Sequence, residues 1–488
     1  MSAIVTAYTL PRSGVRPRFG GKELLAPAFV TTLGGLLLLR PALDPDLGWH
    51  LRAGQEVLAG GGPLTHDSFS FSLAGASWAD FEWLWEAGLA ALHRSGGMGM
   101  VIAAQAALLA AATLLVYGCL RQRQCGALTA SLATLLMLGN LLAYANVRPG
   151  LSGAFFCALY LWLIERARRS GSWLPLAVLL PVQVLWANVH GSYIQGPLLC
   201  ATFGIGLLLE RREWRPATVY LGLAGSLVAA SFANPLGAGL LRFTLGASNL
   251  GFNRDHNGEW LAPNFHSAAH FPLLLSLLLA MVLPLLNRGW KLGGPEVLLL
   301  AGSTLAVLSS NQFIPFYAVA GAPIIAQLLP RLSERLESRL ALPALAAAVG
   351  LLTMLAGSAF INLRPEAYQK SMRAQFPVDA VGFIEQRQLQ GPMFNEFDWG
   401  SYLISALPRL PVFVDGRTEM YGDEFLRRYL AVETGEEPAG TLFGEYHIRL
   451  ALLKPHSPLA NELRLIDGWQ QLYEDDVAAV FSRGAEAA

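Results

Sequence analysis

Long apolar segments recur between residues 24 and 360 of this chain, and they constrain its fold more than any other feature. A membrane-spanning helix needs about 20 predominantly apolar residues. The sequence therefore predicts a polytopic α-helical membrane protein with about 11 transmembrane helices. Several of the apolar segments are short and rich in glycine, and they are centred on residues 24–39, 98–118, 126–146, 150–164, 174–187, 193–209, 217–233, 271–286, 294–310, 314–329 and 340–360.

Composition excludes several other classes of protein. Charged residues make up 14% of the chain, against about 25% in an average soluble domain, so a soluble globular enzyme is excluded. The 35 basic and 35 acidic residues balance, which argues against a nucleic-acid partner because such a partner requires a concentrated basic face. The cysteines lie in or beside apolar segments and indicate neither a disulfide framework nor a thiolate zinc site; they are Cys119, Cys125, Cys157 and Cys200.

Basic residues predict the orientation of these helices. Short cytoplasmic loops carry an excess of lysine and arginine, and the basic residues here gather in every second loop. The N-terminus is then cytoplasmic, the loops 40–97 and 234–270 are external, and the first apolar segment, which lacks a small-residue cleavage site, is an uncleaved signal anchor. The basic residues on the predicted cytoplasmic side are Arg12, Arg16, Arg18, Lys22, Arg121, Arg123, Arg166, Arg168, Arg169, Arg211, Arg212, Arg215, Arg288, Lys291, Arg331, Arg335 and Arg339.

Two aspartates follow the first apolar segment, in the sequence Asp44-Pro45-Asp46. Asp44 before proline is typical of a helix N-cap, and the helix that follows, with His50 on the face of Asp46, is expected to lie in the membrane interface. One interpretation is that Asp44 only caps this helix. The other is that two carboxylates near lipid have a use: they deprotonate an acceptor hydroxyl or hold Mg²⁺ or Mn²⁺ on phosphate oxygens.

Further polar side chains lie in the external loops. The first loop continues with a second amphipathic stretch over residues 77–93, which contains Asp80, Glu82 and several tryptophans that an aromatic belt at the membrane interface also explains. Arginine matches the geometry of phosphate oxygens, although it also snorkels to the membrane surface. The candidates for binding a donor phosphate are Arg148, His190, Arg254 and His256, with Glu259 beside them in a loop that is otherwise expected to be solvated.

After Asn362 the composition changes to short apolar runs that alternate with helical patterns, which predicts a small α/β domain over residues 361–488. Strands are expected at 391–395, 410–414, 448–453 and 477–481, and helices at 377–388, 401–407, 423–430 and 458–465. Two acidic turns follow strands, where α/β folds present ligands. Their candidate ligands are Asp398, Trp399, Gly400 and Tyr402 in the first turn, and Asp415 and Arg417 in the second.

The Asp44–Asp46 pair in a long external loop after the first span resembles the GT-C superfamily of polyprenyl-phosphate-sugar-dependent glycosyltransferases. Residues Asp398, Gly400 and Tyr402 are similar to the Trp-Trp-Asp-Tyr-Gly motif of oligosaccharyltransferase catalytic subunits, with Phe397 and Trp399 departing from it, so recognition of a peptide sequon is not carried over. The resemblance implies a GT-C-like fold over 24–360 after a cytoplasmic segment 1–23, a periplasmic C-terminal domain and a bacterial inner-membrane location.

The same resemblance implies an activity. The protein would move a hexosyl or pentosyl group from a polyprenyl-phosphate carrier to a glycan, lipid or protein acceptor, without an organic cofactor. Asp44 or Asp46 would be the catalytic base or part of a Mg²⁺ or Mn²⁺ site, and the C-terminal turns would help to bind the acceptor. Two alternatives stay open: a ligase or polymerase of undecaprenyl-linked glycan, which would use external arginines and histidine, and a non-enzymatic flippase of lipid-linked sugars.

Overall fold

The computed structural model describes residues 24–211, 214–247, 251–286, 292–329 and 334–484. The predicted cytoplasmic segment 1–23 lies outside these residues, as do the predicted cytoplasmic residues Arg212, Arg288, Lys291 and Arg331. The chain divides into two compact units. We call them the helical unit, which contains Ile102–Leu240, Gly258–Phe360 and the chain up to Arg40, and the mixed unit, which contains Pro41–Val101, Leu241–Asn257 and the chain from Ile361 onwards.

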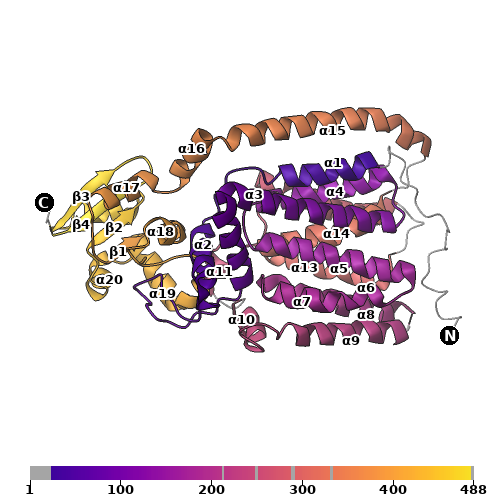
Figure 1. Cartoon of the computed structure of the whole chain (residues 1–488), viewed down its shortest axis with the longest axis horizontal. Helices are drawn as coiled ribbons and strands as arrows, with labels where there is room; N and C mark the ends of the chain where they lie inside the picture. Colours follow the sequence, from indigo (N-terminus) through magenta and orange to yellow (C-terminus); the bar gives the residue numbers. More distant parts are fainter. Residues whose placement is uncertain (1–23, 212–213, 248–250, 287–291, 330–333, 485–488) are drawn as a thin grey trace. The chain divides into compact units, whose positions relative to one another are not determined.

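The helical unit consists of apolar helices packed side by side (Figure 1). Every predicted apolar segment contains a helix among the described residues. In chain order the helices are α1 (Leu25–Leu36), the second part of α3 (Trp83–Gln122), α4 (Ala127–Leu141), α5 (Gly150–Ser170), α6 (Leu174–Ala177), α7 (Leu179–Ala187), α8 (Gln195–Arg211), α9 (Trp214–Ala230), α12 (Phe271–Leu286), α13 (Gly294–Ser309), α14 (Ile314–Leu328) and α15 (Glu334–Asn362).

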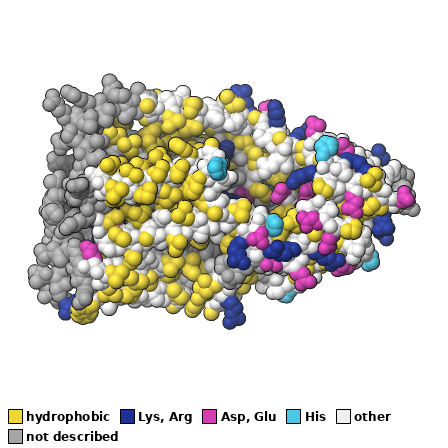
Figure 2. All heavy atoms as spheres, turned by 180° about the vertical axis from the view of Figure 1, so that it is seen from behind, with side chains coloured by type: hydrophobic (Ala, Val, Ile, Leu, Met, Phe, Trp, Pro, Cys, Tyr) yellow, Lys and Arg dark blue, Asp and Glu magenta, His cyan; other side chains and the backbone are white. Residues whose placement is uncertain are grey.

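Helix α14 is the centre of this unit. It contacts α4, α5, α12 and α13, and its side chains are almost all buried. By contrast, large apolar side chains on the outer helices are exposed, among them Leu174, Leu286 and Leu305. Figure 2 shows apolar side chains covering this unit and charged side chains gathered on the mixed unit. Because lipid rather than water solvates such an apolar surface, the pattern agrees with a multi-pass membrane protein.

The predicted number of about 11 transmembrane helices is not confirmed. Among the described residues, four helices are long and apolar enough to cross a membrane, and there are five if Ala347–Asn362 and α16 (Pro365–Gln375), which meet at 74°, form one broken span. Several predicted spans are shorter apolar helices, such as α1 and α13. Helix α13 covers almost all of its apolar stretch, which is itself short, and α1 ends at Leu36, before the end of its stretch.

The mixed unit contains the predicted α/β domain. Its sheet has the order β1-β2-β4-β3, in which β1 and β2 are parallel and the other neighbours antiparallel. Alternate residues of β2 face opposite sides, so Leu450 and Leu452 enter one apolar core and Ala451 and Leu453 another. The strands are β1 (Met393–Asn395), β2 (Leu450–Leu453), β3 (Trp469–Glu474) and β4 (Ala479–Arg483); the helices are α17 (Val378–Gln386), α18 (Gly400–Ala406), α19 (Thr418–Glu433), α20 (Ala439–Glu445) and α21 (Pro458–Leu463).

One predicted strand of this domain was wrong. Residues 410–414 form a single bridge, between Val412 and Ser70 of the first external loop, instead of a strand of the sheet. Instead of pairing with a strand of the sheet, the backbone N–H of Phe413 donates a hydrogen bond to the side-chain Oδ1 of Asn395 at 2.8 Å. Strand β3 was not predicted from the sequence.

The first external loop and the segment 241–257 fold together with the α/β domain. Helix α2 (Leu47–Glu56) packs on α18, and the backbone N–H of Trp49 donates to Ser401 Oγ at 2.9 Å. Helix α11 (Gly251–His256) follows α10 (Gly239–Ala247). Its first residues contact α19, because the carboxylate of Asp423 accepts hydrogen bonds from the backbone N–H groups of Gly251 and Phe252. The second helix of the loop begins at Trp83 rather than Ser77 and continues as α3 through a break at Gly96 and Gly97.

The contact between α2 and α18 gives a test of this packing. A methyl group at Gly48 would lie 2.0 Å from the carbonyl oxygen of Ser401, so Gly48→Ala should separate the helices at a cost of about 1–3 kcal/mol and lower the thermal unfolding midpoint of the purified protein. Gly88→Ala is the control, because Gly88 lies in α3 with open space around it, and alanine in a helix should leave the midpoint unchanged or raise it. Equal midpoints would contradict the close packing.

Candidate active site

Asp44 and Asp46 lie in the turn that leads into α2. Asp44 Oδ1 accepts a hydrogen bond from the backbone N–H of Asp46 at 3.1 Å, and Asp46 Oδ1 accepts one from the indole N–H of Trp49 at 3.2 Å. Asp46 occupies the N-cap position and the helix begins at Leu47, so the predicted N-cap at Asp44 was wrong by two residues. Asp44 stabilises the turn before the helix instead. The structure thus places both aspartates at the start of α2, where Asp44 is buried.

The carboxylate of Asp46 also lies against the second acidic turn of the C-terminal part. A side-chain atom added at Gly416 would meet Asp46 Oδ1 at 1.9 Å, so only glycine leaves room for this approach. Gly400 is similarly close to the backbone of Val414 and to Asp415. These two glycines bring together three segments that are far apart in the sequence: the Asp44–Asp46 turn, the first acidic turn and the second acidic turn.

A buried ion-pair network fixes this arrangement. Arg417 makes two hydrogen bonds with Asp415, at 2.8 and 2.7 Å, and its third nitrogen lies 2.8 Å from Asp67 of the first loop. Its guanidinium also lies over the rings of Phe69 and Trp78. Although burial opposes its charge, the two carboxylates raise the pKa of Arg417. Asp415 and Arg417 are almost completely buried, so these contacts support a structural role, and their predicted role in binding the acceptor stays a prediction.

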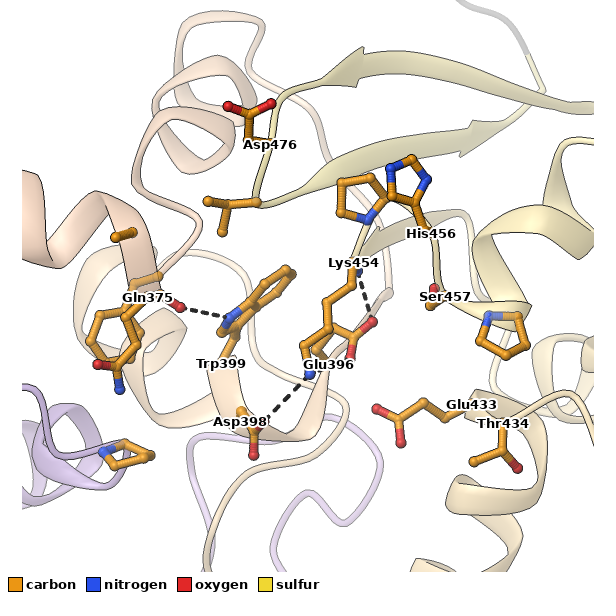
Figure 3. A pocket seen from close by; sticks show the side chains of 16 residues that line it. Gln375, Glu396, Asp398, Trp399, Glu433, Thr434, Lys454, His456, Ser457 and Asp476 are labelled. Carbon is orange, nitrogen blue, oxygen red and sulfur yellow. Dashed lines mark hydrogen bonds and ion pairs between the residues drawn. The ribbon is translucent and has the colours of Figure 1, made fainter. Parts of the chain in front are cut away.

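The first acidic turn lines a pocket of about 860 Å³ (Figure 3). Trp399 is buried in its wall and donates to the carbonyl oxygen of Gln375. Lys454 Nζ lies 3.5 Å from both Glu396 and Asp398. The remaining lining residues include Pro45, Phe376, Glu433, Thr434, His456, Ser457 and Asp476. The pocket thus offers several carboxylates and one lysine, groups that bind hydroxyl or amino groups of a ligand.

Of the predicted acceptor residues, Asp398 and Trp399 line this pocket. Gly400 begins α18 and supplies the close approach to Val414. Tyr402 stacks on Phe376, a lining residue, with ring centroids 5.0 Å apart. The sequence did not single out Lys454, Glu396 or Glu433, because isolated charged residues in an α/β domain are usually solvated surface.

Glu433 differs from the other carboxyl groups of the pocket. Burial raises its pKa to about 7, and the neighbouring Glu396 adds to the rise, whereas the hydroxyl of Tyr429, which donates to Glu433 at 2.9 Å, and Lys454 oppose it. A carboxyl group with this pKa exchanges a proton near neutral pH.

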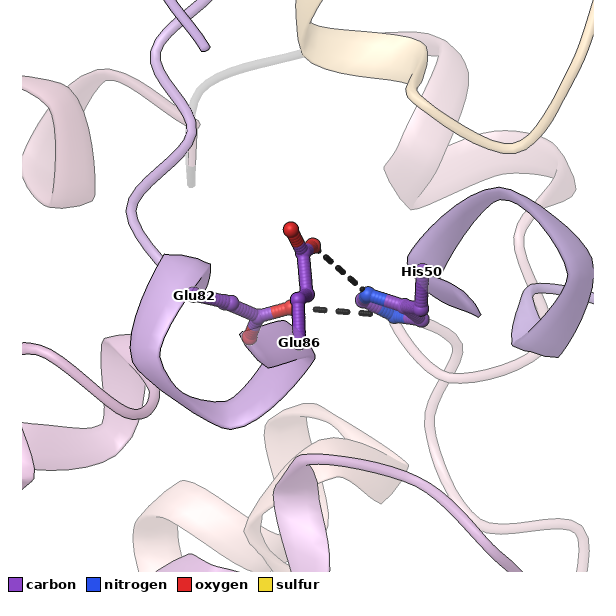
Figure 4. Close-up of side chains that lie close together, drawn as sticks. All are labelled: His50, Glu82 and Glu86. Atoms are coloured by element: carbon purple, nitrogen blue, oxygen red, sulfur yellow. Dashed lines mark hydrogen bonds and ion pairs between the residues drawn. The ribbon is translucent and has the colours of Figure 1, made fainter. Parts of the chain in front are cut away.

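A second polar cluster is buried between α2 and the start of α3 (Figure 4). His50 Nδ1 lies 2.9 Å from Glu86 Oε1, and His50 Nε2 lies 3.8 Å from Glu82 Oε2. These three side chains could hold a metal ion, because their ligand atoms lie within 4.8 Å of one another. Asp80 lies beside Glu86, and burial raises the pKa of Asp80 to about 6. His50, Asp80 and Glu82 were candidates from the sequence; Glu86 was missed, although its i,i+4 spacing from Glu82 was a usable signal.

The predicted phosphate-binding residues divide between the two units. In the helical unit, Arg148 forms an ion pair with Glu259. Burial, with a smaller effect of Arg148, lowers the pKa of His190 to about 4, so this imidazole is neutral at neutral pH. Its Nδ1 lies 2.7 Å from Ser192 Oγ. Arg254 and His256 belong to α11 of the mixed unit and are exposed there.

No family model and no curated protein matches the chain. Solved structures do match its fold. The archaeal oligosaccharyltransferase AglB from Archaeoglobus fulgidus, in complex with an inhibitory peptide and a dolichol-phosphate, gives a TM-score of 0.57 at 10% identity over 88% of this chain and 69% of that one. ArnT from Cupriavidus metallidurans, bound to undecaprenyl phosphate, gives 0.55 at 15% identity over 95% of this chain and 98% of that one.

The chain therefore shares its fold with these two proteins, and the resemblance inferred from Asp44–Asp46 and the first acidic turn is confirmed at the level of the fold. The same AglB has also been solved in a complex with Zn and sulfate, which gives a TM-score of 0.51 over 93% of this chain and 73% of that one at 12% identity. Sequence identity this low carries no residue roles, so the roles of the individual site residues stay predictions.

The buried network predicts a large effect of Arg417→Ala. The substitution leaves Asp415 and Asp67 buried without their cation, at a cost of about 3–5 kcal/mol, and should strongly lower the thermal unfolding midpoint. Arg427→Ala is the matched control, since the ion pair of Arg427 with Asp255 is half exposed and such pairs contribute about 1 kcal/mol or less. If both variants unfolded at the same temperature, the buried network would not have the role assigned here.

Glu433 predicts a pH dependence of stability. Its pKa rises from 4.5 in the unfolded chain to about 7 in the folded protein, so the folded state binds the proton more tightly. Its contribution to stability is present below about pH 4.5 and is lost as the pH rises to about 7. Glu433→Gln should remove this decline and raise the unfolding midpoint at pH 8 relative to the wild type. Parallel pH profiles of the two proteins, measured by thermal unfolding from pH 5 to 8, would contradict the assignment.

Proposed function

We propose that the protein is a GT-C-type membrane glycosyltransferase that takes a sugar from a polyprenyl-phosphate carrier and passes it to an acceptor hydroxyl. The observation that carries the proposal is the placement of Asp44 and Asp46 beside the second acidic turn, within a fold shared with AglB and ArnT. The complexes of those neighbours with dolichol-phosphate and undecaprenyl phosphate support a lipid-linked donor for this chain.

The chemistry requires a base and a stabilised leaving group. In this proposal Asp46 or Asp44 removes the proton of the acceptor hydroxyl as its oxygen attacks the anomeric carbon of the sugar. The bond between that carbon and the carrier phosphate oxygen breaks, and the phosphate leaves with the electron pair. Arg254, which belongs to the same unit as these acids, is the proposed partner of its growing charge, together with His256 of the same helix.

A divalent cation fits the same turn. Mg²⁺ is commonly bound by one or two carboxylates together with substrate phosphates, and Asp44 and Asp46 supply two carboxylates two residues apart in the sequence. We propose that Mg²⁺ or Mn²⁺ binds there with the donor; bound in this way, the ion would neutralise charge on the leaving phosphate.

The pocket beneath the first acidic turn is the proposed acceptor site. Asp398, Lys454 and His456 line it and suit a hydroxyl-bearing acceptor such as a glycan, a lipid headgroup or a side chain of a protein. The proposed place of the reaction is the outer face of a bacterial inner membrane, with the mixed unit in the periplasm, as the distribution of basic loop residues predicts.

The test measures label transfer from a panel of radiolabelled polyprenyl-phosphate sugars to membrane extract by protein purified in nanodiscs. We expect transfer by the wild type and a loss of at least about 100-fold in Asp46→Asn, Asp44→Asn or the double variant, since general base catalysis contributes about 10²–10⁴-fold. Asp467→Asn, at an exposed position of the mixed unit, is the matched control and should transfer at the wild-type rate.

Two other results would contradict the proposal. Transfer at the wild-type rate by the folded double variant would move the chemistry to the arginine and histidine loops, as expected of a ligase or polymerase of undecaprenyl-linked glycan. Movement of unmodified lipid-linked sugar across sealed vesicles, without transfer from any donor, would identify a flippase.

A further inference from the structure

The cluster of His50, Glu82 and Glu86 has no role in the proposed reaction. It joins two elements of the mixed unit, since His50 lies in α2 whereas Glu82 and Glu86 lie one helical turn apart at the start of α3. All three side chains are buried, and that of Glu86 is completely inaccessible to solvent. Helices α2 and α3 approach each other closely here, because a methyl group at Gly54 would lie 2.0 Å from the carbonyl oxygen of Glu86.

The charge of this cluster is unbalanced. The carboxyl groups of Glu82 and Glu86 lie against the imidazole of His50, and Asp80 is hydrogen-bonded to Glu86. Apart from this bond, Glu86 Oε2 and Asp80 Oδ1 have no hydrogen-bond partner among the described residues. Arg417, whose charge opposes the rise in the pKa of Glu86, already pairs with Asp415 and Asp67. A buried carboxylate oxygen without a donor costs several kcal/mol in a protein interior. A missing cation would account for this excess of acceptors.

The geometry suits a single metal ion. A Zn²⁺ ion with bonds of about 2.0–2.1 Å holds tetrahedral ligand atoms about 3.3 Å apart. One ligand atom from each of the three residues lies within 4.8 Å of the others. Glu86 Oε1 lies 2.9 Å from His50 Nδ1, whereas the nearest contact of Glu82, 3.8 Å, is with the other ring nitrogen, Nε2. In Figure 4 the two carboxylates point toward the imidazole from one side of α3. Because one ion can bind only one nitrogen of an imidazole, the Glu82 side chain would have to turn toward Nδ1 for all three residues to bind the same ion.

We propose that His50, Glu82 and Glu86 bind a divalent transition-metal ion, with Zn²⁺ favoured over Mg²⁺, that fastens α2 to the start of α3. Imidazole favours Zn²⁺ and its neighbours in the transition series, whereas Mg²⁺ prefers oxygen ligands alone. The buried set supplies three of the four ligands that a tetrahedral Zn²⁺ takes. The site is distinct from Asp44 and Asp46, but Asp46 is the N-cap residue of α2, so an ion at His50 would also fix the direction of the turn that carries the proposed catalytic acids.

The alternative explanation is a proton shared between Asp80 and Glu86, which would satisfy both acceptors without any metal. The two explanations differ in a direct measurement. A metal site binds one ion per chain and is stabilised by it, because an ion that binds only the folded state raises the unfolding midpoint. A shared proton predicts no bound ion and no response of the midpoint to Zn²⁺.

The experiment uses the full chain, purified with a tag that contains no histidine, stripped with a chelator and titrated with Zn²⁺, Mn²⁺ or Mg²⁺ alone. We expect one Zn²⁺ per chain by elemental analysis and a higher unfolding midpoint. His50→Gln, Glu82→Gln and Glu86→Gln should each weaken Zn²⁺ binding by at least about 10-fold, measured by competition with a chromophoric chelator. His66→Gln in the same loop and Glu385→Gln in α17, both at exposed positions, are the matched controls and should bind as the wild type does.

A measurement on the wild type alone covers the case in which a variant does not fold. X-ray absorption at the zinc edge should show one imidazole and oxygen ligands. A spectrum without imidazole, Zn²⁺ affinity unchanged in folded Glu86→Gln, or a stripped protein that takes up no Zn²⁺ would each overturn the proposal.

Discussion

The ion pairs of Arg417 are the interaction on which the arrangement of the site depends. A guanidinium removed from water requires nearby carboxylates, and here one of them, Asp415, is local while the other, Asp67, comes from the first external loop. The loop consequently cannot leave the α/β domain without exposing a buried charge. Its attachment places the Asp44–Asp46 turn against Gly416, so the proposed catalytic acids belong to the same compact unit as the proposed acceptor pocket.

Most elements could be predicted because their signals are local. A long apolar run that lies in lipid forms a helix because its backbone polar groups must find partners within the run, and each predicted run does contain a helix. The number of spans was less accessible, since several apolar stretches form helices shorter than a membrane span requires. The strand expected at 410–414 failed for a tertiary reason: the Asn395 amide occupies the hydrogen-bonding position of a neighbouring strand. Strand β3, with its polar Gln470 and Gln471, gave no apolar signal.

The candidate site was predictable in its residue types but not in their burial. Asp398 and Trp399 were recognised from a motif, and both line a pocket. Asp415 and Arg417 were predicted from an acidic turn after an expected strand, yet the fold buries them as a structural pair, which a single sequence cannot reveal. Glu86 was missed because the tryptophans and leucines around it are typical of an interfacial belt. Its importance depends on His50, 36 residues earlier in the chain.

Helix α2 combines two kinds of polar group with opposite requirements. A general base must meet its substrate and keep a pKa suited to proton transfer, so it belongs in a turn at the edge of the fold, and the partly exposed Asp46 lies in the turn before the helix. A structural ion needs the reverse, a closed site without exchange of ligands, and His50 lies one turn further along with its imidazole buried. Because the backbone N–H of His50 donates to the carbonyl oxygen of Asp46, any displacement of the buried cluster moves the acid as well.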